Sequence, residues 1–301
     1  MDIYINDQPL NFTLQGETVF SDVRREVMKW LADEYYVAET CEIDEKQVSI
    51  DQIDAWDDTN IDQIGFVRFH VRPLAELNFE RLQTVHQYLL LLKKALEKEN
   101  AGVFTELSGE YPIIEKELNK ILNPGNNDAQ NSDVILFTSQ LEQSGFFQNT
   151  ISQKDAAINA AKLCEGFLSI LYERMHEISN PEEELRASIT TLSSLIEPMN
   201  EIPVLLQTGK DREAMTTVLQ FVEVSQKLIR LYPLLKVTSD FDMQQKLSSG
   251  ETLEQFYADL NKILLELTEA FHAKDSVLIG DLLEYEIAPR IENLITLVRE
   301  G

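Results

Sequence analysis

Histidine is the residue type in this chain most suited to binding a transition metal, and the spacing of its four histidines argues against such a site. They are His70, His86, His176 and His272, and no two of them lie four residues apart. A helix presents two imidazoles to one metal ion when they are separated by that interval. We therefore predict no metal site.

The acidic segment from Asp54 to Asp62 approaches the pattern of a calcium-binding loop when the loop is started at Asp58. Such a loop requires glycine at its sixth position and a bidentate glutamate at its twelfth. Here those positions hold Gln63 and Phe69. We expect this segment to be a solvated loop, because acidic runs usually are.

Signatures of nucleotide binding and of nucleophilic catalysis are also missing from the sequence. The 11 glycines form neither a phosphate-binding loop nor a dinucleotide fingerprint, and no serine occurs in a nucleophile-elbow pattern. Cys164 falls on the apolar face of a predicted helix, which favours a small buried side chain. We predict no cofactor and assign no catalytic residue. An enzyme is disfavoured but not excluded, because catalytic residues can converge from distant positions.

Residues 1–73 show the alternating pattern of strands around a single helix. Apolar residues alternate with polar ones through Ile3 and Ile5, and again through Leu10, Phe12 and Leu14. The spacing then becomes helical at Phe20, Val23, Val27, Trp30 and Leu31. Residues 37–43 and 48–50 predict two short strands, and residues 65–72 predict a last one. The pattern predicts a small α+β domain.

The order of these elements resembles the β-grasp, or ubiquitin-like, fold. Sulfur carriers and protein modifiers of that kind end in a Gly-Gly tail, whereas this module ends in Arg72-Pro73 and continues into further chain. The resemblance therefore implies a docking role in place of sulfur transfer or conjugation. It also implies that the first and last strands are parallel neighbours at the centre of the sheet.

That arrangement would place a group of basic and aromatic side chains on one exposed face of the sheet. The group consists of Tyr4, Arg68, His70 and Arg72, with Asn11 and Thr13 beside them. Arginine and tyrosine are enriched at binding hot spots because they combine apolar area with directional hydrogen bonds. These four residues are the candidate partner-binding site. The alternative is that they form the solvated side of an ordinary alternating strand.

Residues 74–301 predict an all-α domain, an irregular bundle of helical hairpins with about eight helices. Apolar residues recur at three- and four-residue spacing in segments 75–99, 103–122, 133–147, 155–178, 182–207, 212–237, 253–273 and 276–299. Asn180-Pro181 and the capping box from Thr252 to Gln255 mark two of the helix starts. The segment from Asn123 to Ser132 is polar and rich in turn residues, so we predict a loop there.

The net charge limits the classes of partner that we expect, and the cysteine content indicates the cellular compartment. The chain carries 26 Lys and Arg against 52 Asp and Glu, a formal net charge of −26. Such a field repels phosphate backbones and anionic lipids, so we expect no nucleic-acid or membrane partner. The sequence shows neither a secretory signal nor an apolar run long enough to span a bilayer, and its two cysteines form no disulfide framework. We expect a soluble, cytoplasmic protein.

Together these features predict a two-domain protein, 1–73 and 74–301, that acts as a non-enzymatic interaction, scaffold or adaptor protein with protein partners. A homodimer through a helix interface is compatible with the pattern. One alternative is an assembly or export chaperone that binds a partner helix. The other is an enzyme or small-ligand sensor with a pocket between the two domains, where polar groups would converge.

Overall fold

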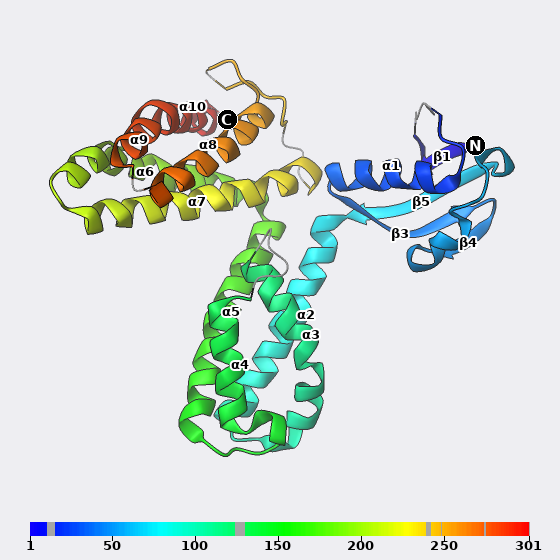
Figure 1. The fold of residues 1–301 in the computed structure, drawn as a ribbon, viewed down its shortest axis with the longest axis horizontal. Helices are drawn as coiled ribbons and strands as arrows, with labels where there is room; N and C mark the ends of the chain where they lie inside the picture. Colours follow the sequence, from blue (N-terminus) through cyan, green and yellow to red (C-terminus); the bar gives the residue numbers. More distant parts are fainter. Residues whose placement is uncertain (11–15, 124–129, 239–241, 248, 274, 301) are drawn as a thin grey trace. The chain divides into compact units, whose positions relative to one another are not determined.

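The computed structural model describes residues 1–10, 16–123, 130–238, 242–247, 249–273 and 275–300 (Figure 1). It divides into two compact units. The first combines residues 1–75 with residues 180–301, and the second consists of residues 76–179. Each unit is described in turn.

A mixed five-stranded sheet forms the amino-terminal part of the first unit. Its strands are β1 (Asp2–Ile5), β2 (Gln8–Pro9), β3 (Tyr36–Ile43), β4 (Lys46–Ser49) and β5 (Phe66–Pro73). They lie in the order β2-β1-β5-β3-β4. β1 and β5 are parallel neighbours, which confirms the prediction for the first and last strands. The predicted strand residues Phe12 and Leu14 lie outside the described residues.

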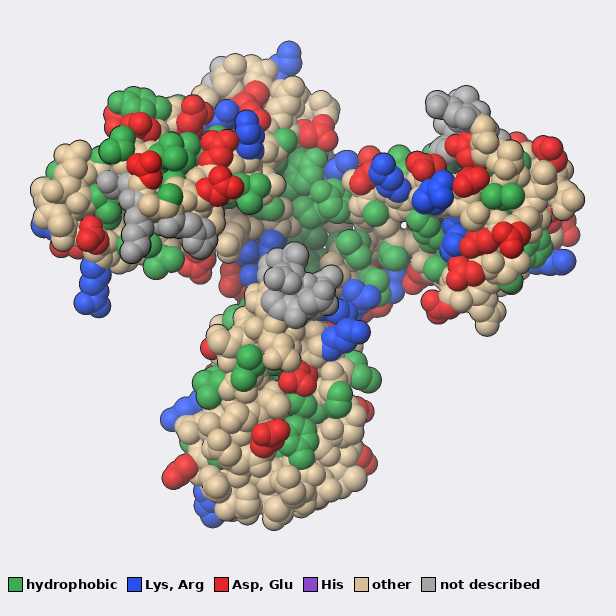
Figure 2. All heavy atoms as spheres, in the orientation of Figure 1, with side chains coloured by type: hydrophobic (Ala, Val, Ile, Leu, Met, Phe, Trp, Pro, Cys, Tyr) green, Lys and Arg blue, Asp and Glu red, His purple; other side chains and the backbone are tan. Residues whose placement is uncertain are grey.

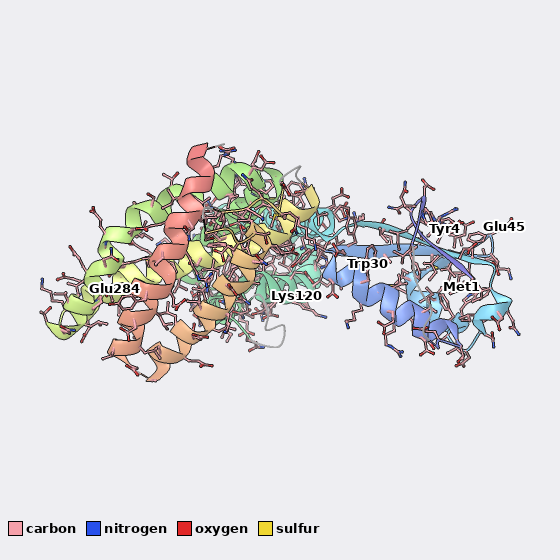
Figure 3. The ribbon with its side chains drawn as sticks, turned by 90° about the horizontal axis from the view of Figure 1, so that it is seen from above. Met1, Tyr4, Trp30, Glu45, Lys120 and Glu284 are labelled. Carbon is pink, nitrogen blue, oxygen red and sulfur yellow. The ribbon has the colours of Figure 1, made fainter. Side chains whose placement is uncertain are left out.

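The helix α1 (Phe20–Asp33) packs across one face of this sheet (Figure 1). Its residues Phe20, Val23, Val27 and Leu31 are almost fully buried, as their three- and four-residue spacing predicts. They belong to one hydrophobic cluster with the inward side chains of the strands, including Val67 and Phe69. Trp30 is 40% exposed, so its predicted place in the apolar stripe was wrong. Figure 3 labels it on α1.

The polar segment before β5 forms two short 3₁₀ helices, η1 (Ile50–Trp56) and η2 (Ile61–Gln63). Arg24 on α1 binds the carboxylates of Asp54 and Asp57, each at 2.7 Å. Both carboxylates are therefore already paired with a cation of the chain. The segment forms short helical turns joined to α1 by these ion pairs, while the side chains of Asp54 and Asp58 stay exposed to solvent.

The second unit is a bundle of four helices, α2 (Leu74–Glu97, which begins in the first unit), α3 (Phe104–Leu122), α4 (Ser132–Ser144) and α5 (Lys154–Ser179). Two short 3₁₀ turns, η3 (Ala101–Val103) and η4 (Phe146–Gln148), lie in its connections. All four helices contribute to a single hydrophobic cluster. Tyr111 is central to its aromatic side chains, with its ring centroid 6.0 Å from that of Phe137 and 6.2 Å from that of Phe146. Cys164 is fully buried in the same cluster, as predicted.

The carboxy-terminal part of the first unit is helical. It contains α6 (Pro181–Gln207), α7 (Asp211–Thr238), α8 (Leu253–Ala273), α9 (Ser276–Asp281), the π-helical turn η5 (Leu282–Ile287) and α10 (Ala288–Glu300). α6 and α7 pack along each other. Because α9, η5 and α10 follow without a break, the described chain after the sheet contains eight helical runs, which confirms the predicted fold class.

The two helix starts predicted from sequence are in place. α6 begins with Pro181, although the Asn180 side chain makes no capping bond. At α8 the capping box is formed in full. The backbone N–H of Gln255 donates to the Thr252 hydroxyl at 3.2 Å. The backbone N–H of Thr252 donates to the side-chain oxygen of Gln255 at 3.0 Å.

Candidate binding surface on the open sheet face

The sheet face opposite α1 carries the candidate residues because of strand alternation. Val67 and Phe69 point toward α1 and are fully buried, so Arg68 and His70 point to the other side. The register pairs Arg68 with Tyr4 on β1 and with Glu42 on β3. No described element of this part of the unit covers that face. We call it the open sheet face.

Arg68 lies at the centre of the open sheet face and is held on three sides. Its guanidinium Nη1 donates to a Glu42 carboxylate oxygen at 2.8 Å. The guanidinium carbon lies 5.5 Å from the ring centre of Tyr4 and 5.7 Å from that of Phe66. The two rings meet edge to face with centroids 6.3 Å apart. Arg68 is therefore fixed before any partner arrives, which lowers the entropy cost of binding.

Arg72 lies four residues further along the same face of β5, and an irregularity in β3 provides its partner. The pairing of β3 with β5 shifts between Ala38 and Thr40, which leaves Glu39 as the extra residue of a bulge. The Glu39 carboxylate lies 2.7 Å from Arg72 Nε. The bulge thus positions a second carboxylate beside a second arginine.

His70 lies between the two arginines in sequence and borders a shallow hollow. The hollow has a volume of about 280 Å³ and is lined by His70, Glu42, Glu45 and Gln47. Glu45 has a positive φ of 68° and belongs to the tight turn between β3 and β4. Figure 3 labels Glu45 and Tyr4 in the sheet domain. The side chains around the hollow include both hydrogen-bond donors and hydrogen-bond acceptors.

The structure brings the four predicted residues onto one face, but it changes their electrostatic character. The sequence predicted a basic and aromatic patch. Glu42 and Glu39 are paired with its two arginines, so the patch is of mixed charge. Figure 2 shows basic and acidic side chains interspersed over the sheet domain. Phe66 is a further aromatic member that the sequence analysis missed. Asn11 and Thr13 lie outside the described residues.

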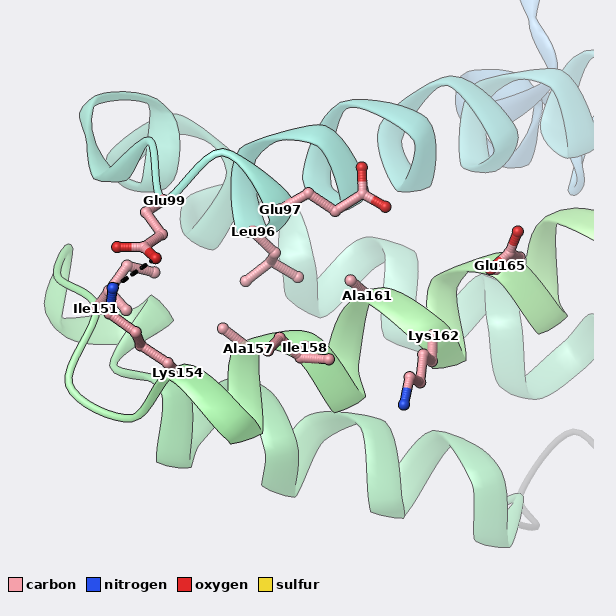
Figure 4. Close-up of a pocket in the computed structure, with 10 residues that line it drawn as sticks. All are labelled: Leu96, Glu97, Glu99, Ile151, Lys154, Ala157, Ile158, Ala161, Lys162 and Glu165. Carbon is pink, nitrogen blue, oxygen red and sulfur yellow. Dashed lines mark hydrogen bonds and ion pairs between the residues drawn. The ribbon is translucent and has the colours of Figure 1, made fainter.

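The second unit contains another hollow, a groove of about 290 Å³ between α2 and α5 (Figure 4). Its floor is apolar and includes Leu96, Ala157 and Ala161. Its rim is charged, with Lys154 Nζ lying 2.7 Å from a Glu99 carboxylate oxygen. This groove has small alanine side chains on one wall and a closed ion pair at one end.

Both cysteines are buried. Burial raises the pKa of the Cys41 thiol and that of the Cys164 thiol to about 12, so both are protonated at neutral pH. Among the described residues, no three His, Cys, Asp or Glu side chains gather as a metal site requires. No described helix combines the length and hydropathy that a bilayer span requires.

The fold defines a protein with a small mixed α+β module, the helices α2 to α5 and the helices α6 to α10. Two family models match separate parts of this chain. Residues 1–73 match a family model described as the TP0873 N-terminal domain, which ends where β5 ends. Residues 183–297 match one described as Domain of unknown function (DUF8042). Both matched ranges lie in the first compact unit.

The chain is also similar to a protein of Treponema pallidum (strain Nichols) described as an uncharacterized protein. The two are 30% identical over 110 residues, which is 36% of this chain and 54% of the relative. The chain thus spans about half the length of that relative. No solved structure matches the chain.

Proposed function

We propose that this chain is a non-enzymatic protein-interaction adaptor of the cytoplasm that docks a protein partner on its open sheet face. The observation that carries the proposal is Arg68, which is held between Tyr4 and Phe66 on a face left uncovered in the module. Arginine stacked on aromatic rings combines planar apolar contact with directional donors, as hot-spot residues do.

The N-terminal module is interpreted as β-grasp-like, and its end supports docking over carrier chemistry. Leu74 follows Pro73 directly as the first residue of α2, and its backbone N–H donates to the Tyr35 carbonyl at 2.8 Å. The end of β5 is thus hydrogen-bonded to the turn after α1. A carrier needs a free, extended tail for its carboxylate. This module has a fixed strand end in that place.

The partner surface is expected to combine mixed charge with an apolar contact beside Arg68. A partner approaching the open sheet face meets two arginines and two carboxylates, with Tyr4 and Phe66 next to Arg68. Complementary charges at such a face set the specificity and orientation of a complex more than its affinity. Capture of a second copy of this chain would make the adaptor a homodimer through this face.

The test is affinity capture of partners from the native cell extract with the full chain and with two double variants. Arg68→Gln with Arg72→Gln removes both charges from the open sheet face while keeping hydrogen-bonding side chains. Arg25→Gln with Lys29→Gln removes two exposed charges from α1, which lies on the other face of the module. A stoichiometric partner lost only with the first variant supports the proposal. A partner retained by both variants, or no partner, contradicts it.

Neutral variants are preferred to charge reversal for a structural reason. Arg68→Glu would place two carboxylates opposite each other on neighbouring strands, because Glu42 faces this position. Like charges in that position destabilise a sheet. A loss of binding could then not be separated from a loss of structure.

A further inference from the structure

A pocket of about 380 Å³ is lined by three tyrosines together with a carboxylate and a carboxamide. Its lining residues are Tyr35, Ile229, Tyr232, Glu254, Tyr257, Ala258 and Asn261. Two of them come from α7, four from α8 and Tyr35 from the turn after α1, all within the first compact unit. The volume lies at the lower end of the range for small-molecule sites.

The three rings form a continuous aromatic wall with Tyr232 in the middle. The centroids of Tyr232 and Tyr257 are 5.0 Å apart with the rings tilted by 54°. Tyr35 meets Tyr232 edge to face, with centroids 6.1 Å apart. Differently oriented tyrosine faces around one space are suited to a cation, which is attracted by the electron-rich faces of the rings.

Glu254 supplies a negative charge that has no basic partner among the described residues. One of its carboxylate oxygens accepts from the Tyr232 hydroxyl at 3.1 Å, and the other from the Gln244 side-chain amide at 2.8 Å. Both donors are neutral. The nearby Lys236 ammonium lies 2.9 Å from a Glu34 carboxylate oxygen and 5.9 Å from the Tyr35 ring centre. Its ion pair is with Glu34, and its interaction with Glu254 acts at longer range, so no ion pair neutralises the Glu254 carboxylate in the described part of the structure.

Tyr257 provides a donor whose acceptor is missing. The side chain is 5% exposed, and its hydroxyl has no hydrogen-bond partner in the described part of the structure. Burial raises the pKa of this phenol, so it is neutral and can donate. An unpaired buried hydroxyl costs free energy. A ligand with an oxygen acceptor would remove that cost.

We propose that this tyrosine pocket binds a small organic cation that carries a hydroxyl or carbonyl oxygen, a class that includes the amino alcohols and their methylated ammonium forms. The cationic nitrogen is placed against Glu254 and the face of Tyr232, and the oxygen accepts from Tyr257. The proposal is independent of partner docking on the open sheet face, because the two sites share no residue.

The first test is isothermal titration of the full-length chain with choline and with its uncharged carbon isostere, 3,3-dimethylbutan-1-ol. The two probes have the same shape and hydroxyl, so they differ only in charge. We expect choline to bind with a dissociation constant on the order of 1 mM or lower. The isostere should bind at least about tenfold more weakly. Equal affinities, or no binding of either probe, would overturn the proposal.

Two variants assign the roles of the polar groups. Glu254→Gln keeps a side-chain oxygen acceptor but removes the charge. It should weaken the binding of choline about tenfold or more and leave the binding of the isostere unchanged. Glu269→Gln is the matched control, since it removes an exposed carboxylate from the same helix. If both variants weaken the binding of choline equally, the loss reflects the reduced net negative charge of the whole protein. The assignment of the site to Glu254 then fails.

Tyr257→Phe should raise the stability of the free protein and lower its affinity for choline. Removing the unpaired hydroxyl should raise the thermal midpoint of the free protein. The same change should weaken choline by about threefold to tenfold, because the ligand loses a hydrogen-bond donor. A variant that is stabilised yet binds choline as tightly as the original protein would show that the hydroxyl does not contact the ligand.

Discussion

The contact between Arg68 and Glu42 gives a quantitative prediction for the stability of the N-terminal sheet. The perturbations are Arg68→Gln, Glu42→Gln and the two together. In the structure the pair is 2.8 Å apart, and the side chains are 31% and 24% exposed. Pairs that solvent can reach contribute only up to about 1 kcal/mol, so we assign the pair about 1 kcal/mol.

The aromatic neighbours add a contribution that depends on Arg68 alone. The guanidinium carbon is within 6 Å of the ring centres of Tyr4 and Phe66, and exposed cation–π contacts contribute about 0.5 to 1 kcal/mol. Taking about 1 kcal/mol for both rings, Arg68→Gln should cost about 2 kcal/mol and Glu42→Gln about 1 kcal/mol. The double variant should cost about 2 kcal/mol, because the pair is lost only once.

Amide hydrogen exchange of β5 in the full-length chain is the appropriate assay. A protein of two compact units need not unfold in one step, whereas exchange reports the opening of one segment. Arg68→Gln should accelerate exchange of the β5 amides about 30-fold, and Glu42→Gln about fivefold. If Glu42→Gln has the same effect with and without Arg68, the two side chains are not coupled and the reasoning fails.

Two further predictions concern other parts of the chain. Cys41 and Cys164 should resist alkylation in the native protein and react after unfolding. Folding raises the pKa of both thiols from about 9 to about 12, so the folded state favours the protonated thiols. The free energy of unfolding is therefore unaffected by these thiols at neutral pH and falls as pH rises above about 9. Thermal melts from pH 7 to 11 would detect this fall. Replacing Thr252 by alanine removes an N-cap of α8 and should cost about 1 kcal/mol, measured by hydrogen exchange of that helix.

The side of the sheet on which each residue lies could be predicted because it depends only on alternation along one strand. Val67 and Phe69 are inside and Arg68 and His70 outside, as the apolar and polar positions of that segment indicate. The parallel pairing of β1 with β5 was implied by the resemblance to the β-grasp fold. Trp30 shows the limit of such patterns, because helical spacing does not reveal where an apolar stripe ends.

The partners of the arginines could not be predicted, because they depend on the register between strands that are distant in sequence. Glu42 faces Arg68 across β3 and β5, and Glu39 reaches Arg72 only through the bulge in β3. In the sequence both glutamates occupy ordinary polar positions of an alternating segment. The tyrosine pocket could not be predicted for the same reason, since Tyr35 is 197 residues from Tyr232 and 222 residues from Tyr257 in the sequence.

The ion pairs on the open sheet face have a consequence for any partner. A partner that covers Arg68 must remove the pair with Glu42 from water, and this desolvation offsets much of the gain from new contacts. Affinity should therefore come mainly from the apolar surface of Tyr4 and Phe66. Discrimination should come from the paired charges, because a partner that leaves either arginine or its carboxylate unsatisfied loses several kcal/mol, on the order of 2 to 5. Such a face favours selective and reversible docking, which is the behaviour that the proposed adaptor role requires.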